Sequence, residues 1–139
     1  PLKVGVVGAG GLGQHHVRIL RDMPETELVG FAETNAERAA KIAADLGVRH
    51  VGSLDALLDE VEAVTIVVPT PAHHQVAMAA LRKGKHVLIE KPIAATLAEA
   101  DEMVATAKAN GCVLQTGHVE RFNRAVRAAL PYIDTPRFI

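Results

Sequence analysis

Short β-branched runs alternate with Ala-rich amphipathic segments along the whole of this chain, which has 139 residues. The runs at 2–7 and 63–68 are almost continuously apolar, as is typical of strands that are covered on both faces. The segments between the runs repeat apolar residues at helical spacing, and the connections are short. Strands that alternate with helices in this way pair in parallel through right-handed crossovers. The sequence therefore predicts an α/β fold built on one doubly wound parallel sheet.

Six strands are expected in this sheet, and the sequence marks where several of the helices between them begin and end. The strands are predicted at 2–7, 27–32, 49–51, 63–68, 85–90 and 112–115. Ser53 is a helix-start signal, and Thr96 and Glu99 form a T-x-x-E capping box that begins another helix. Three glycines each follow a helical segment, where a left-handed backbone is favoured: Gly47, Gly84 and Gly111.

The length of the chain suits one domain, which can bury roughly two thirds of its unfolded surface. We expect residues 1–122 to form that domain. Residues 123–139 are predicted to supply a last helix, which stops at Pro131, and the start of a connection to a further domain. Three of the four aromatic residues lie within the last 18 residues, 122–139, and residues 136–139 have the composition of a strand.

The charge balance and the hydropathy exclude several classes of protein. The 15 basic and 16 acidic side chains give a formal net charge of −1, whereas a sequence-independent nucleic-acid binder needs a basic face. No apolar run reaches the roughly 18 residues of a membrane span, and no secretory pattern precedes the first strand. We therefore expect a cytoplasmic protein with neither a nucleic-acid partner nor a membrane partner.

The cysteine and histidine patterns argue against a metal site. The single cysteine, Cys112, excludes an internal disulfide framework and a Cys-rich metal site. The seven histidines include two adjacent pairs, at 15–16 and 73–74, whose side chains point about 100° apart on a helix. No two histidines have the i, i+4 spacing, and no cysteine or carboxylate stands at ligand spacing. We expect no bound metal.

A G-x-G-x-x-G motif directly follows the first predicted strand and opens the first helix. Its residues are Gly8, Ala9, Gly10, Gly11, Leu12 and Gly13. A glycine-rich turn alone is a weak signal, but this context is that of a dinucleotide-binding unit. Gly8 permits a tight turn, Gly10 lets the backbone approach a pyrophosphate, and Gly13 lets the helix pack close to the strand. The free N–H groups and the positive end of the helix dipole would then hold the phosphates.

Glu33 stands 20 positions after Gly13, at the end of the second predicted strand. A carboxylate there can accept both ribose hydroxyls of the adenosine half and repels a 2′-phosphate, which favours NAD over NADP. Arg38 and Lys41 follow one or two helical turns later, where a cation can accommodate that phosphate. A solvated loop acid is the alternative interpretation of Glu33. We expect NAD as the cofactor, with NADP as the alternative.

The cluster Glu90-Lys91-Pro92 stands at the C-terminal end of the fifth predicted strand, at the sheet edge where ligands bind in open α/β folds. A lysine near a substrate hydroxyl can hold it by a charge-assisted hydrogen bond and assist proton loss as hydride leaves the carbon. Pro92 restricts the backbone of Lys91. On spacing alone, a solvated surface charge is the commoner fate of such a lysine.

Two prolines bracket a threonine where the fourth predicted strand ends, in the sequence Val68-Pro69-Thr70-Pro71. A stiff loop with few donors at that edge could form a wall for a flat ring. A plain turn from strand to helix explains the same residues equally well.

Together these motifs resemble the Gfo/Idh/MocA oxidoreductase family. The matching segments are KVGVVGAGGLGQHH, VPTPAHHQVA, LRKGKHVLIEKPIA and TGHVERFN, within about residues 2–130. The resemblance implies a Rossmann dinucleotide-binding domain that is followed by a C-terminal α/β substrate domain. It also implies NAD(P)-dependent hydride transfer between nicotinamide and a hydroxyl or keto group of a sugar, nucleotide sugar or inositol-like substrate. The TGHVERFN segment is most similar to members that act on UDP-N-acetylglucosamine-type sugars.

The same resemblance implies roles for individual residues. Lys91 would be catalytic, beside the nicotinamide and the reacting hydroxyl. The implied cofactor-binding residues are Gly8, Gly10, Gly11, Leu12, Gly13, Glu33, Thr34, Arg38, Pro69, Thr70, His73, Glu90, Lys91, Pro92, His118 and Arg121. Arg124 departs from the family pattern, in which proline often follows R-F-N.

Family members place a second catalytic group, usually a histidine, in the C-terminal domain, and they associate largely through its sheet. We therefore expect this chain to stop short of the substrate domain, to turn over weakly or not at all alone, and to form a homo-oligomer in full-length form. One alternative is an NAD(P)-binding regulatory protein without chemistry on the same fold. Another is a different reductase class, such as an amino-acid or tetrapyrrole reductase, which shares the glycine loop but does not usually combine P-T-x-x-H with E-K-P.

Overall fold

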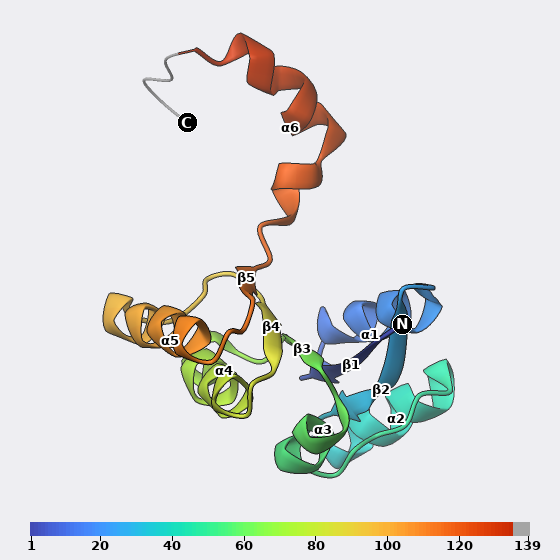
Figure 1. Cartoon of the computed structure of the whole chain (residues 1–139). Coiled ribbons are helices and arrows are strands. Elements are labelled where there is room, and N and C mark those ends of the chain that lie inside the picture. The colour runs from blue at the N-terminus through green and yellow to red at the C-terminus, as the bar shows by residue number, and fades with distance from the viewer. Residues whose placement is uncertain (135–139) are drawn as a thin grey trace.

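The computed structural model of the protein describes residues 1–134 and shows a parallel sheet of five strands (Figure 1). The strands lie in the order β2-β1-β3-β4-β5, and every neighbouring pair is parallel. Their bounds are Leu2–Val7 for β1, Thr26–Ala32 for β2, Ala63–Ile66 for β3, His86–Ile89 for β4 and Leu114–Thr116 for β5. The strand order therefore reverses at β1, as in a doubly wound fold.

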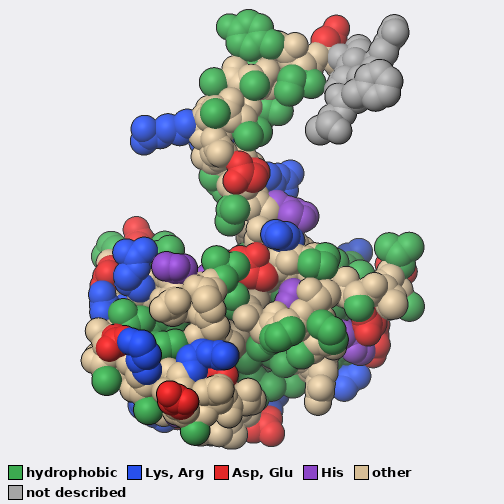
Figure 2. Space-filling model, turned by 180° about the vertical axis from the view of Figure 1, so that it is seen from behind, with side chains coloured by type: hydrophobic (Ala, Val, Ile, Leu, Met, Phe, Trp, Pro, Cys, Tyr) green, Lys and Arg blue, Asp and Glu red, His purple; other side chains and the backbone are tan. Residues whose placement is uncertain are grey.

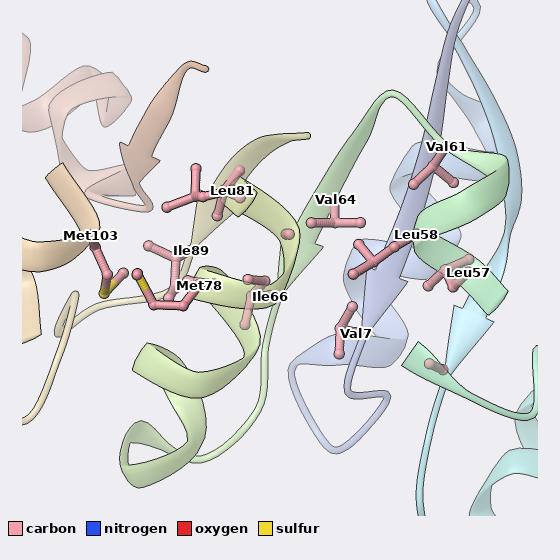
Figure 3. Close-up of a cluster of buried hydrophobic side chains, with 14 of the residues drawn as sticks. Val7, Leu57, Leu58, Val61, Val64, Ile66, Met78, Leu81, Ile89 and Met103 are labelled. Carbon is pink, nitrogen blue, oxygen red and sulfur yellow. The ribbon is translucent and has the colours of Figure 1, made fainter. Parts of the chain in front are cut away.

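Helices cover both faces of the sheet, which confirms the predicted architecture. Their bounds are Gly13–Asp22 for α1, Ala36–Leu46 for α2, Leu54–Glu60 for α3, His73–Arg82 for α4 and Leu97–Ala109 for α5. Val17 of α1 packs with Val6 in one apolar cluster, to which α2 also contributes. Val7 belongs to a second cluster, with Leu81 of α4 and Met103 of α5 (Figure 3). Val6 and Val7, which are successive residues of β1, thus pack on opposite faces of the sheet, as strand geometry requires.

The sheet has one strand fewer than the sequence predicts, because residues 49–51 form only an isolated bridge between His50 and Phe31. Two hydrogen bonds hold it: Phe31 N donates to Arg49 O at 3.0 Å, and Val51 N donates to Phe31 O at 2.8 Å. The segment between Gly47, which ends α2, and Ser53, which caps α3, therefore pairs with β2 at Phe31 alone.

The local signals for helix ends are confirmed. The Ser53 side chain accepts a hydrogen bond from Ala56 N, and Thr96 and Glu99 form the reciprocal capping box. The three glycines that follow helical segments, Gly47, Gly84 and Gly111, all have positive φ values of 63°, 73° and 65°. These positions need a left-handed backbone, for which glycine carries no steric penalty.

The chain leaves the sheet after β5 and stands away from the main body (Figures 1 and 2). The last helix, which the sequence predicts at about 122–130, is found as α6 at Arg124–Ala129; a 3₁₀ turn at Val119–Phe122 precedes it, and a second 3₁₀ turn follows at Leu130–Tyr132. Asn123 begins α6, since its side chain accepts a hydrogen bond from Ala125 N. A domain boundary at residue 122 stays a prediction. The strand-like run at 136–139 lies outside the described residues.

Gly84 and Gly52 form a matched pair for testing the backbone constraint at the end of α4. A Cβ added at either glycine meets no atom within 4 Å, but only Gly84 has a positive φ. We expect Gly84→Ala to lower the free energy of unfolding by about 1 kcal/mol, because an L side chain disfavours that conformation. Gly52→Ala should be neutral, or stabilise by up to about 1 kcal/mol, since it restricts the unfolded chain. Urea denaturation followed by circular dichroism measures both, and equal losses would contradict the assignment.

Candidate functional site

The candidate site lies along one edge of the sheet. Because all five strands are parallel, their carboxyl ends meet at that edge, and the loops that follow them carry the predicted residues. These loops hold the glycine motif after β1, Glu33 after β2, Pro69 and Thr70 after β3, the 90–92 cluster after β4 and His118 after β5. Ligands bind at this edge in open α/β sheets. Arg121 differs from the others, because it lies in the 3₁₀ turn that leads away from the sheet.

The glycine motif is closed at its two ends and open in the middle. A Cβ at Gly8 would lie 2.7 Å from Val67 O, and one at Gly13 would lie 2.1 Å from Gly8 O. A Cβ at Gly10 would meet only Arg38, at 3.9 Å, and one at Gly11 would meet nothing within 4 Å. The outer glycines therefore permit close backbone contacts, whereas the inner ones leave room above the loop. No side chain caps the N-terminus of α1, which an anion can then occupy.

Glu33 joins the glycine motif to the end of β2. Its Oε2 accepts a hydrogen bond from Ala9 N at 3.0 Å, and its Oε1 accepts one from Asn35 N at 2.8 Å. Arg38 Nη1 lies 3.3 Å from Oε2, and the Glu33 side chain is only 5% exposed. Burial raises the pKa of this carboxyl, but the two backbone donors and Arg38 outweigh burial and hold the pKa below its ordinary value of 4.5.

Glu90, which follows β4, receives contacts from three elements. Its Oε1 lies 3.2 Å from His16 Nε2 of α1, and its Oε2 accepts a hydrogen bond from Lys91 N at 3.2 Å. After β5, a Cβ at Gly117 would lie 3.3 Å from Oε1, so the chain passes close to the carboxylate. The Lys91 side chain beside it is exposed, and the Lys91–Pro92 peptide bond is cis.

His73 is buried between two of the loops. Its Nδ1 lies 2.8 Å from Pro92 O, and its Nε2 lies 2.9 Å from Val68 O. Both partners are carbonyl oxygens, which only accept hydrogen bonds. With 1% of its surface exposed, the ring links the loop after β3 to the loop after β4. The structure thus places His73 behind the surface of the site rather than on it.

Sequence reasoning missed two features of this site. The first is the bonding of Glu33 to Ala9 N, which joins residues 24 positions apart. The second is His16, whose one signal in the sequence is a polar residue on the apolar face of the first helix. Within residues 1–134, no group of three or more His, Cys, Asp or Glu residues could hold a metal ion. No helix in that range is long and apolar enough to cross a membrane.

Comparison with known proteins agrees with this geometry. A family model described as an oxidoreductase family with an NAD-binding Rossmann fold matches residues 2–118. The chain belongs to the Gfo/Idh/MocA oxidoreductase family. This match confirms the resemblance that the motifs carry, and it covers every strand of the sheet.

Individual relatives give the same result. The chain is 42% identical over 126 residues to UDP-N-acetylglucosamine 3-dehydrogenase of Acidithiobacillus ferrooxidans, covering 91% of this chain and 40% of that protein. A solved structure of that enzyme has a TM-score of 0.88 at 40% identity, covering 98% of this chain and 45% of the other. The chain therefore spans about two fifths of the length of the relatives that it matches.

Solved relatives hold either nicotinamide cofactor. GenD2 from gentamicin A biosynthesis, in complex with NAD, has a TM-score of 0.88 at 29% identity over 96% of this chain and 39% of its own. Biliverdin reductase of Synechocystis sp. PCC 6803, with biliverdin and NADP⁺, has a TM-score of 0.86 at 33% identity over 97% of this chain and 44% of its own. Biliverdin reductase thus shares the fold of this domain.

We expect Glu33→Gln to lower the free energy of unfolding at pH 7 by about 1–3 kcal/mol, because it removes a charged acceptor from buried donors. The folded-state pKa of Glu33 is lowered, so its contribution is present above the ordinary value of 4.5 and is lost as pH falls through the lowered value. The difference between wild type and variant should therefore shrink in acid. Urea denaturation across this pH range measures it, with the exposed Glu25→Gln as control. A difference independent of pH would contradict the assignment.

Proposed function

We propose that this chain is the cofactor-binding part of an NAD(P)-dependent dehydrogenase that acts on a hydroxyl or keto group of a sugar, nucleotide sugar or inositol-like substrate. One observation carries the proposal: the glycine motif, the acid after β2 and the Glu90-Lys91-Pro92 cluster meet at one edge of a parallel sheet. Membership of the family supports it, as does the similarity to a nucleotide-sugar dehydrogenase.

The residues at this edge fit a dinucleotide. The space above Gly10 and Gly11 lets the backbone approach a pyrophosphate, and the uncapped N-terminus of α1 offers N–H groups and a positive dipole end. Leu12, Thr34 and Arg38 are exposed beside this loop or the end of β2, and we assign them to cofactor contacts with Pro69, Thr70, His118 and Arg121. These assignments follow from the family motif and from the position of each residue.

The state of Glu33 refines the choice between NAD and NADP. An ionised carboxylate has about four acceptor positions, and three of them are taken by Ala9 N, Asn35 N and Arg38. One position therefore remains for a ribose hydroxyl, and a second becomes free only if Arg38 moves away. Arg38 is 48% exposed, so its guanidinium can instead turn to a 2′-phosphate. We infer that this domain accepts both cofactors, NAD through Glu33 and NADP through Arg38.

Lys91 is the residue to which we assign the chemistry. Bound nicotinamide would supply the hydride acceptor or donor. The Lys91 ammonium would hold the substrate oxygen by a charge-assisted hydrogen bond and ease the loss of its proton. The backbone beside it is held by Glu90, whereas the residue itself is exposed. Cytoplasmic location and homo-oligomeric assembly of the full-length enzyme stay predictions of the sequence.

NADH and NADPH should each bind this 139-residue chain saturably, which titration of cofactor fluorescence measures. We expect Arg38→Ala to lower NADPH affinity about tenfold, because a charge-assisted hydrogen bond to phosphate is lost. NADH affinity should stay the same or rise, since Glu33 regains an acceptor position. Lys41→Ala, a cation on the same helix that pairs with Asp45, is the matched control. Equal losses for both cofactors would contradict the role of Arg38, and no saturable binding of either would contradict the proposed function.

Lys91→Met should separate chemistry from cofactor binding. In the enzyme that carries this domain we expect turnover to fall about 10²–10⁴-fold, because the group that assists proton transfer is gone. NADH affinity, measured on the same variant, should change less than threefold. Losses of equal size in turnover and affinity would show instead that Lys91 only supports the structure of the cofactor site.

A further inference from the structure

The position of Lys91 is set by its neighbours in the chain. Within residues 1–134, its side chain makes no hydrogen bond and no ion pair with another residue. The residues on either side of it are held instead, Glu90 through its carboxylate and Pro92 through its carbonyl oxygen. Anything that holds these two residues therefore also sets where the ammonium can reach.

On the upstream side, the Glu90 carboxylate contacts His16. The two side chains are 20% and 12% exposed, so little water competes with the contact between His16 Nε2 and Glu90 Oε1. The same carboxylate accepts the hydrogen bond of Lys91 N. His16 lies on α1, one helical turn after Gly13, and this helix also provides the phosphate-binding end of the site.

On the downstream side, Pro92 O contacts His73. The other ring nitrogen of His73 contacts Val68 O, so one buried ring joins the loops after β3 and β4. Both contacts are partly buried, and a carbonyl oxygen that loses its partner where little water can replace it lowers the stability of the fold. Within residues 1–134, no other side chain hydrogen-bonds to either carbonyl. His73 is therefore the side chain whose two ring nitrogens link the two loops.

We propose that His16 and His73 are positioning residues that hold the segment around Lys91 from two sides. The proposal rests on the catalytic role assigned to Lys91 above. His16 ties the segment to α1, the helix whose N-terminus would bind the cofactor phosphates, and His73 ties it to α4. Because α1 carries both the phosphate-binding turn and His16, cofactor binding at one end of the helix is transmitted to Lys91. A displacement of about 1 Å at a reacting group can cost about 10²-fold in rate.

The two adjacent histidine pairs supply matched controls. His15 is exposed on α1 beside His16, and His74 pairs at the surface with Glu102 beside His73. We therefore compare His16→Leu with His15→Leu, and His73→Asn with His74→Asn. His16→Gln, which keeps a donor near Glu90, is the conservative variant expected to restore the wild-type behaviour.

The first readout is the NMR signal of Lys91 in this chain, after reductive ¹³C-methylation of the lysines and assignment through Lys91→Arg. In wild type we expect NADH to shift this signal. In His16→Leu and His73→Asn the shift should differ in size or direction from that of wild type, because Lys91 is no longer held in the same place, while NADH affinity stays within about threefold and both controls behave as wild type. A purely structural role would leave the Lys91 shift in place in every variant that folds.

The second readout is steady-state kinetics of the enzyme that carries this domain. We expect kcat to fall about 10–100-fold in His16→Leu and His73→Asn, with little change in the KM for NADH. Unchanged kcat and an unchanged Lys91 signal in folded His16→Leu would overturn the proposal, and if His73→Asn fails to fold, His73→Gln takes its place. Failure of the proposed function looks different: wild type would bind no cofactor, or Lys91→Met would turn over normally.

Discussion

Parallel pairing of five short strands is the constraint on which the rest of this molecule depends. In a parallel sheet every strand ends at the same edge, so five loops from distant parts of the chain meet there without any of them being long. The apolar clusters on the two faces hold the sheet in this register. Val6 is 0% exposed and Val7 is 5% exposed, and they belong to different clusters. A shift of β1 by one residue would exchange the two faces and displace the glycine motif with them.

The site is compact because glycines stand where two backbone segments approach each other. A Cβ at Gly13 would lie 2.1 Å from Gly8 O, which is inside any permitted contact, so only glycine allows α1 to begin where it does. At Gly117 the tolerance is greater, since its Cβ would lie 3.3 Å from the Glu90 carboxylate. Close approach thus brings α1, β4 and β5 near to one carboxylate.

The sequence alone predicts the parts of this fold that local chemistry decides. The helix caps at Ser53 and Thr96 depend on residues within one turn, and so do the left-handed glycines. All of these features are found where they are predicted. The strand predicted at 49–51 is wrong, since the structure has only one isolated bridge there. A strand needs several consecutive paired residues, which a β-branched composition does not guarantee. The last helix lies near its predicted place, with Asn123 as its N-cap. How far a segment pairs with the neighbouring strand depends on the packing around it, which residue types do not specify.

The partners of the site residues depend on strand order, which no local pattern contains. Because β1 lies beside β2, the loop with Ala9 meets the loop with Glu33, and the acid becomes a bridge between them. Because β3 lies beside β4, His73 reaches Pro92. The sequence shows two histidines in a row at each place, about 100° apart on a helix, and only the packing decides which of them faces inward. Once the strand order is known, the same chemical reasoning that identified the motifs also identifies their partners.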